Sequence, residues 1–214
     1  MASLFRMTLV AAAVGLAVAC SSSTSEGGGG GTPPSQLSVL RLATGSPPLC
    51  ADSVGAWLAK NPGGPELELA LLFPKSGQMA DCLVGETEDF LRFRLKPDAL
   101  LRFPDSTLIA NGDSVFISVK WVGTDSILFE MKPSGLTFDP SEPAELKIQY
   151  DHAGPDLNRD NEVNAEDDAV EQRLDIWRQE RPGDSFFRVG TAKVEELKEI
   201  EARLFGFSRF AIAY

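Results

Sequence analysis

The 214-residue sequence is poor in the side chains that carry most enzyme chemistry. It has a single histidine, His152, and three cysteines, Cys20, Cys50 and Cys82, with no Cys-x-x-Cys pair. A cysteine–histidine zinc site is therefore not expected. Gly-x-Ser-x-Gly, Walker-loop and His-Glu-x-x-His motifs are also missing, and with them the signatures of common hydrolases, nucleotide-binding proteins and zinc peptidases. We interpret the chain as non-enzymatic, leaving open a carboxylate-based enzyme, whose cleft has no sequence signature.

Positive charge is also scarce. Twenty Lys and Arg residues stand against 31 Asp and Glu residues, which gives a formal net charge of −11. An acidic domain repels nucleic acid and anionic lipid headgroups. We therefore expect no nucleic-acid partner, whereas calcium or a basic partner would suit the charge.

The longest apolar run lies at the amino terminus and is short. Arg6 is followed by Met7–Ala19, a segment typical of an export signal and too short to span a membrane comfortably. Leu16-Ala17-Val18-Ala19-Cys20 resembles a bacterial lipobox. The resemblance implies that residues 1–19 are removed and that Cys20 is lipidated. The alternative is an ordinary signal peptide cleaved after Ala19, with Cys20 left unmodified.

Residues 20–35 are rich in Ser, Gly and Pro, and Ser21–Pro34 contains no apolar group that could join a core. Such a composition predicts a flexible tether. A tether directly after a lipidated cysteine indicates a domain held off a membrane of the cell envelope. Ser21 replaces the Asp that often retains lipoproteins at the inner membrane, which favours the outer membrane or the cell surface. The expected partners are the membrane, through the lipid, and an envelope protein or glycan.

With Cys20 assigned to the lipid, Cys50 and Cys82 form an even pair in an exported chain. We expect them to be bridged, the alternative being two buried free thiols. The bridge would tie a small α+β subregion, residues 36–88. Here Ala51–Lys60 has helical spacing and Glu66–Phe73 reads as a strand.

Residues 89–214 have the pattern of a β-sandwich. Polar and apolar residues alternate from Phe90 to Leu95, and turn signals recur about every ten residues. The expected strands include 115–121, 127–131, 136–138 and 145–150. Arg203–Tyr214 is expected to form a final strand pair, with Phe205 among its core residues. The predicted fold class is therefore mainly β, a sandwich with the disulfide-tied subregion and one inserted loop.

That inserted loop runs from residue 156 to residue 167 and carries the most specific pattern in the chain. Oxygen-bearing side chains occupy loop positions 1, 3, 5, 9 and 12, namely Asp156, Asn158, Asp160, Asn164 and Asp167. Glu162 at position 7 offers its backbone carbonyl. Val163 at position 8 is the apolar residue expected to anchor the loop to the core. Calcium takes six to eight oxygen ligands, and this is the ligand order of an EF-hand loop.

The loop resembles the dockerin variant of the EF-hand, D-x-N-x-D-x-x-[VI]-x-x-x-D. Position 6 is Asn161 in place of the usual Gly, but Asn tolerates a left-handed backbone. Only one copy is present, whereas dockerins carry two. The resemblance implies a calcium ion. In the expected strand layout the loop connects two strands of the sandwich, which would give the ion a structural role. An ordinary acidic turn, a calcium-dependent enzyme and a dockerin-like docking module are the alternatives.

A second resemblance covers about half of the mature chain. Phe129–Phe138, Pro143–Tyr150 and Phe207–Tyr214 are similar to the β-domain of ankyrins, netrin receptors and their bacterial surface relatives. The usual histidine of the closing motif is replaced by Gly206. The resemblance implies an interaction or architectural module. The alternative is that any sandwich with aromatic-rich strands has this pattern.

Overall fold

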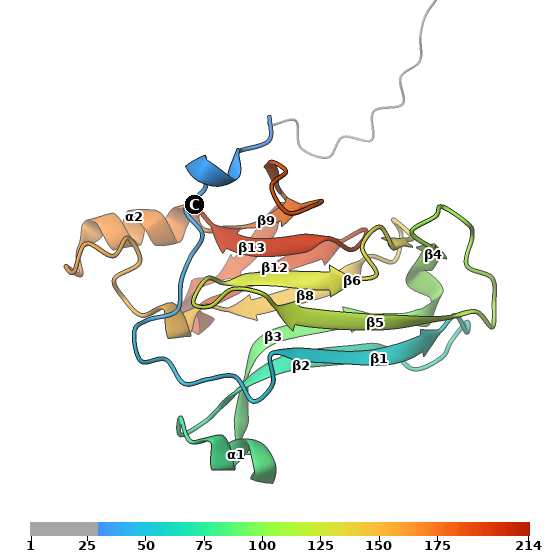
Figure 1. Ribbon diagram of the computed structural model, residues 1–214, viewed down its shortest axis with the longest axis horizontal. Coiled ribbons are helices and arrows are strands. Elements are labelled where there is room, and N and C mark those ends of the chain that lie inside the picture. Colours follow the sequence, from blue (N-terminus) through green and yellow to red (C-terminus); the bar gives the residue numbers. More distant parts are fainter. Residues whose placement is uncertain (1–29) are drawn as a thin grey trace, which may run out of the picture.

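The computed structural model describes residues 30–214, which form two stacked antiparallel sheets (Figure 1). The six-stranded sheet contains, in spatial order, β1 (Ser53–Ala59), β5 (Ser114–Trp121), β6 (Leu128–Lys132), β13 (Arg209–Ala213), β9 (Asp175–Gln179) and β10 (Phe186–Arg188). The five-stranded sheet contains β11 (Thr191–Val194), β12 (Glu199–Leu204), β8 (Ala144–Gln149), β3 (Thr87–Leu95) and β2 (Leu67–Pro74). The predicted β-sandwich is confirmed.

The remaining elements are short. A two-stranded ribbon is formed by β4 (Leu100–Arg102) and β7 (Thr137–Phe138). The α-helices of the described residues are α1 (Met79–Val84) and α2 (Ala165–Arg173), and the 3-10 turns are Pro34–Gln36, Pro97–Ala99, Asp151–Ala153 and Glu195–Leu197.

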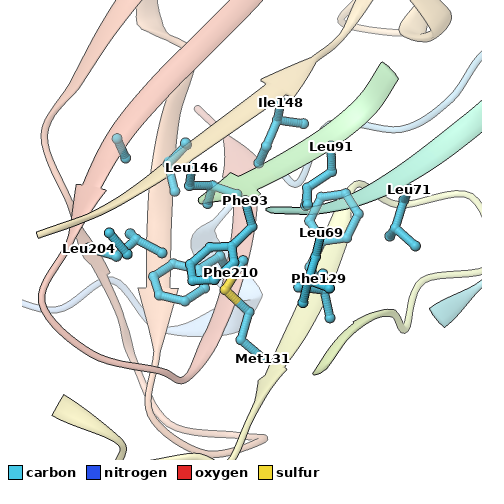
Figure 2. Packing of buried hydrophobic residues seen from close by; sticks show 14 of the residues in the cluster. Leu69, Leu71, Leu91, Phe93, Phe129, Met131, Leu146, Ile148, Leu204 and Phe210 are labelled. Carbon is cyan, nitrogen blue, oxygen red and sulfur yellow. The ribbon is translucent and has the colours of Figure 1, made fainter. Parts of the chain in front are cut away.

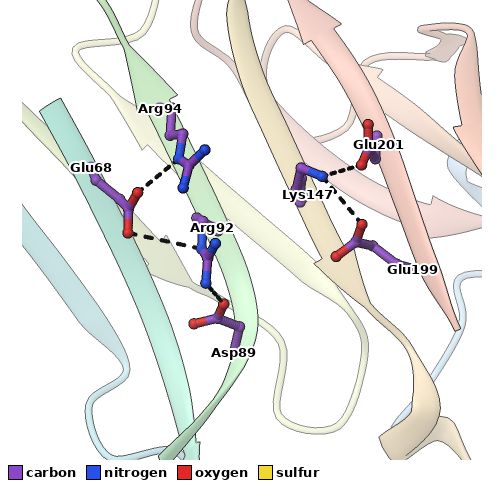
Figure 3. A network of polar contacts seen from close by, with 7 residues as sticks. All are labelled: Glu68, Asp89, Arg92, Arg94, Lys147, Glu199 and Glu201. Carbon is purple, nitrogen blue, oxygen red and sulfur yellow. Dashed lines mark hydrogen bonds and ion pairs between the residues drawn. The ribbon is translucent and has the colours of Figure 1, made fainter. Parts of the chain in front are cut away.

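The core lies between the two sheets, as alternation along the strands requires. Phe93 and Leu146 come from the five-stranded sheet, and Phe129, Met131 and Phe210 from the six-stranded sheet; all five side chains are fully buried (Figure 2). The outer face of the five-stranded sheet instead carries cross-strand ion pairs between β2 and β3 and between β8 and β12 (Figure 3).

β1 corrects one prediction, because Ala51–Lys60 is not helical. All seven residues of β1 pair with β5, from Ser53 opposite Lys120 to Ala59 opposite Ser114. The burial pattern alternates, with Leu58 buried and Trp57 70% exposed. Three apolar residues at helical spacing in so short a window stabilise a helix less than a complete hydrogen-bonded ladder with the neighbouring strand β5 stabilises a strand.

The end of the chain corrects a second prediction. β12 and β13 belong to different sheets and do not pair with each other. The chain crosses between the sheets at residues 205–208, where Phe207 is buried against Phe138 while Phe205 is 43% exposed. A side-chain carbon at Gly206 would lie 2.7 Å from the carbonyl oxygen of Leu136. The histidine of the resembled closing motif therefore does not fit here without a backbone shift.

The disulfide prediction is confirmed. Cys50 and Cys82 are bridged, with their Cα atoms 5.6 Å apart. Cys82 lies on α1, which buries no residue and projects beyond the sheets (Figure 1); Leu83 is 89% exposed. α1 was not predicted, and the two strands of this subregion, β1 and β2, extend one sheet each.

The segment before β1 runs alongside β13 and the residues that precede β6. It pairs with its neighbours through isolated bridges, Val39 with Ala213 and Arg41 with Ser126. Leu40 donates its backbone N–H to the carbonyl of Ile212, at 2.8 Å. This segment forms one wall beside the acidic loop.

Candidate calcium loop

The acidic loop connects the two sheets. It begins after β8 and the Asp151–Ala153 turn, continues into α2, and reaches β9 in the opposite sheet. In Figure 1, α2 lies at one end of the sandwich, outside both sheets. The expectation that the loop joins two strands is therefore confirmed. A change in the loop would act directly on how the sheets are joined.

The first half of the loop is a series of side-chain-to-backbone turns. Asp156 Oδ2 accepts a hydrogen bond from the Asn161 N–H at 3.0 Å, and Asn158 Oδ1 accepts one from the Asp160 N–H at 3.0 Å. Asp160 Oδ1 accepts one from the Glu162 N–H at 2.8 Å. These bonds are typical of Asp and Asn in tight turns. They curl the backbone so that positions 1, 3 and 5 stay close together.

The backbone at position 6 is left-handed. Asn161 has φ 70°, and Arg159 has φ 63°. The prediction that Asn161 adopts the conformation usually given to Gly is thus confirmed. The Arg159 side chain points to the neighbouring segment, where its guanidinium donates to the carbonyl of Leu42 and lies 3.8 Å from Asp125.

Asp167 closes the second half of the loop. Its Oδ1 accepts from the backbone N–H groups of Leu157 (2.7 Å) and Asn158 (3.2 Å), and its Oδ2 accepts from the Asn164 N–H (3.0 Å). Asn164 caps α2 by accepting from the Glu166 N–H at 2.7 Å. Asp167 therefore ties position 12 to positions 2, 3 and 9, and it is only 3% exposed.

The electrostatics of Asp167 follow from these bonds. The N–H of Asn164, with those of Asn158 and Leu157, lowers the pKa of the Asp167 carboxyl below its ordinary value, although burial opposes the shift. Backbone N–H groups stabilise the charged form because each places a partial positive charge against the carboxylate. Asp167 is therefore ionised over the whole neutral range.

One oxygen at the start of the loop has no partner. Asp156 Oδ1 is buried and makes no hydrogen bond, whereas Oδ2 of the same carboxylate is held by Asn161. A buried charged oxygen without a partner is costly. A cation with oxygen ligands would satisfy it, so the Asp156 carboxylate is compatible with a calcium ligand.

The remaining predicted ligands are arranged more openly. The side chains of Glu162 and Asn164 are exposed. Among residues 30–214, no three acidic, histidine or cysteine side chains form a metal cluster. Val163 is 66% exposed, which corrects the prediction that it anchors the loop to the core. Leu157 and Val170 are the buried apolar residues on either side of the loop.

A hydrogen-bonded network that the sequence did not predict holds α2 beside β8. The Tyr150 hydroxyl donates to Glu171 Oε1 at 2.9 Å, and Lys198 Nζ lies 2.6 Å and 2.7 Å from the two carboxylate oxygens. Burial raises the pKa of Tyr150 well above its ordinary value, and the bond to Glu171 adds to this. Burial also favours a raised pKa for Glu171, but the bonds from Lys198 and Tyr150 outweigh it, and the pKa is lowered.

These three residues line a cavity of about 330 Å³ together with Leu157, Val163 and Asp167 of the loop. They come from three separate elements, so no local pattern connects them. A tyrosine at a strand end and a glutamate on the following helix are the only signals in the sequence.

Cys20, the expected lipidation site, and the export signal lie outside the described residues. No helix in residues 30–214 is long and apolar enough to cross a membrane. Nothing matches this chain in comparisons with models of protein families, with curated proteins or with solved structures.

Proposed function

We propose that this protein is an exported, lipid-anchored protein of the cell envelope whose sandwich holds a structural calcium ion at residues 156–167. Its role is binding or support, not catalysis. The observation that carries the calcium site is the carboxylate of Asp156, with one oxygen fixed by the Asn161 N–H and the other buried and unpartnered. The export signal, the lipobox-like sequence before Cys20 and the Ser/Gly/Pro segment support the envelope location.

In this proposal the ion is held by Asp156, Asn158 and Asp160, by the carbonyl of Glu162 and by Asp167, with Asn164 acting through water. Asp167 Oδ1 already accepts two hydrogen bonds, so its contribution comes through Oδ2, which accepts one. Calcium offsets the mutual repulsion of three carboxylates. Because the loop joins the two sheets, the free energy of binding becomes part of the free energy of folding.

The expected size of the effect follows from mass action. Extracellular calcium modules bind at roughly 0.1–1 mM. At about 10 mM calcium the folded state would gain about 1.4–2.7 kcal/mol. For a domain of this length that corresponds to a rise in Tm of about 3–11 °C.

The test is a thermal melt of residues 20–214 carrying Cys20→Ser, in 10 mM calcium and in EGTA. Asp156→Asn removes the unpartnered anionic oxygen with little change of shape. Asp168→Asn, an exposed residue just beyond the loop, removes the same charge and serves as the control. We expect the calcium shift to vanish in Asp156→Asn and to persist in Asp168→Asn. Equal shifts in both variants, or no shift in the parent, would refute the site.

The lipid anchor is tested separately. The full chain, expressed in a bacterium with labelled palmitate, should carry the label in the membrane fraction. Cys20→Ser should abolish the label. Labelling that persists in the variant would contradict the assignment, and so would a parent chain secreted without label.

A second candidate function is calcium-dependent docking through the loop itself, and the exposure of Val163 favours it. An apolar side chain 66% exposed beside the acidic residues is the kind of group that a partner would cover. The simplest partner to test is a second copy of the chain. Sedimentation that shows a calcium-dependent dimer, lost in Val163→Ser, would support this function; a monomer in both conditions would exclude self-docking.

The likeness to the β-domain of ankyrins and netrin receptors stays a prediction. Its aromatic positions Phe129, Phe138 and Phe207 are core residues here, which both that likeness and an ordinary sandwich require. An architectural or interaction module fits the proposed envelope role.

A further inference from the structure

A second cavity, of about 350 Å³, opens between the β9–β10 hairpin of the six-stranded sheet and the end of β12 in the five-stranded sheet. We call it the arginine cavity. Arg178, Glu180, Phe187, Arg188, Arg203 and Phe205 are the lining residues that matter here. The volume is within the range of small-ligand sites.

The charge of this cavity is opposite to that of the chain. Three arginines and one glutamate line it, in a protein with a net charge of −11. Arg178 Nε donates to Glu180 Oε1 at 2.7 Å. Arg188 Nε lies 3.2 Å from Asp175 Oδ2, and its guanidinium lies 5.5 Å from the centre of the Trp177 ring.

Arg203 is different, because within residues 30–214 its side chain forms no hydrogen bond or ion pair. Arg203 is an exposed residue that lines the cavity. Guanidinium groups bind phosphate and carboxylate in a bidentate manner. The cavity thus offers an unpaired oxyanion-binding group.

The walls of the cavity are apolar. Phe187 is 48% exposed and Phe205 is 43% exposed, whereas the core phenylalanines are almost fully buried. Phe210 and Leu204 form the buried floor. Half-exposed rings beside an unpaired guanidinium are suited to a ligand with one anionic and one apolar part.

The cavity also lies next to the point where the described chain begins. The backbones of Thr32 and Phe186 exchange two hydrogen bonds of 2.8 Å, and the first described residues lie beside the β9–β10 region in Figure 1. A side-chain carbon at Gly31 would lie 2.7 Å from the Phe187 ring, so Gly31 packs against that ring. Ten residues lie between Cys20 and Gly31, so the two positions are about 40 Å apart at most. If Cys20 is lipidated as proposed, the cavity stays within that reach of the membrane.

We propose that the arginine cavity binds a phosphate or carboxylate group joined to an apolar body. Two sources carry this chemistry: the headgroup of an anionic membrane lipid and a soluble anionic amphiphile. The membrane source alone rests on the proposed lipid anchor; the site itself rests on Arg203 and the two phenylalanines.

The test uses residues 20–214 with Cys20→Ser, in EGTA, so that neither calcium nor the lipid contributes. The soluble probes are dihexanoyl-phosphatidylglycerol below its micelle concentration and inorganic phosphate, followed by titration calorimetry. Arg203→Gln should weaken binding of the short-chain lipid about tenfold, as expected for loss of one charge-assisted hydrogen bond. Arg102→Gln makes the same charge change outside the cavity and should alter binding less than twofold.

Phe205→Ser separates the two parts of the ligand. It should weaken binding of the short-chain lipid and leave inorganic phosphate unaffected. Equal effects of Arg203→Gln and Arg102→Gln would overturn the proposal, as would a parent that binds neither probe at millimolar concentration. Unchanged lipid affinity in Phe205→Ser would overturn the apolar part.

Vesicles distinguish the sources. Co-sedimentation with vesicles of phosphatidylcholine containing phosphatidylglycerol, but not with phosphatidylcholine alone, would assign the membrane lipid. Binding of the short-chain probe without vesicle binding would assign a soluble amphiphile. A failed calcium or palmitate experiment leaves these outcomes unchanged, so this proposal and the proposed function can fail independently.

Discussion

Removal of the Cys50–Cys82 bridge gives the most quantitative prediction for this fold. The two cysteines are 32 residues apart. In the chain-entropy model, closing a loop of that length restricts the unfolded chain and stabilises the folded state by about 3.7 kcal/mol at 25 °C. Because the closed loop contains β1 and β2, which belong to different sheets, the bridge restrains the whole sandwich. For a domain of this length the expected fall in Tm is about 7–15 °C.

The assay compares melts of the Cys20→Ser chain with and without a reductant, and of a Cys50→Ala/Cys82→Ala double variant. The reduced parent and the double variant should melt together, and reductant should not affect the double variant. A difference below 2 °C between the oxidised parent and the double variant would refute the reasoning. It would mean that the unfolded chain is already as restricted without the bridge.

The bridge should also control α1 locally. α1 buries no residue, and Asp81 joins it to the preceding turn through bonds of 2.7 Å and 2.6 Å to Ser76. Hydrogen exchange in residues 76–86 should therefore increase after reduction even at temperatures where the sheets stay protected. Unchanged protection there would show that the turn holds α1 without the bridge.

Three further predictions concern stability. The pKa values of Asp167 and Glu171 are lowered from ordinary values of 3.8 and 4.5. Their contribution to the stability of the fold is therefore complete above those ordinary values and is lost as pH falls through the lower pKa values of the folded state. Tm should be steady from pH 7 to about 5 and fall below about pH 4. Phe129→Ala should cost about 3–5 kcal/mol in a denaturant titration, whereas Trp57→Ala on the exposed face should cost about 0.5 kcal/mol or less; similar costs would contradict the assigned faces. Gly206→Ala should lower Tm, because its added carbon meets the carbonyl oxygen of Leu136; an unchanged melt would show that the crossing segment adapts.

Local patterns predicted the local structure. The alternation along residues 89–95 and 115–121 gave β3 and β5, and the even pair of cysteines gave the disulfide. The left-handed conformation of Asn161 was also predicted correctly, because the need for such a residue at position 6 is a property of the loop backbone alone. Such features depend on neighbours in the sequence and are visible there.

Features that depend on distant neighbours were missed. Whether β12 pairs with β13 depends on which sheet each joins. β12 joins β8 and β13 joins β6, and both of these partners lie far back in the chain. Val163 was expected in the core because position 8 is apolar, but burial depends on what lies opposite it. The arginine cavity combines Arg178 with Arg203 from two sheets, so neither residue could be recognised alone.

The segment before β1 and the end of β13 are joined by hydrogen bonds in both directions. Ser38 donates to the Tyr214 carbonyl at 3.3 Å, and Tyr214 donates to the Ser38 carbonyl at 3.1 Å. A short linker could therefore connect Tyr214 to residue 36 and make the domain circular without moving a strand. New ends opened at Gly183, in the exposed turn of the β9–β10 hairpin, would give a permuted protein with the same sandwich. An anchor attached to the new ends of such a permutant would also lie beside the arginine cavity, although it would join the chain at the β9–β10 hairpin instead of at the segment before β1.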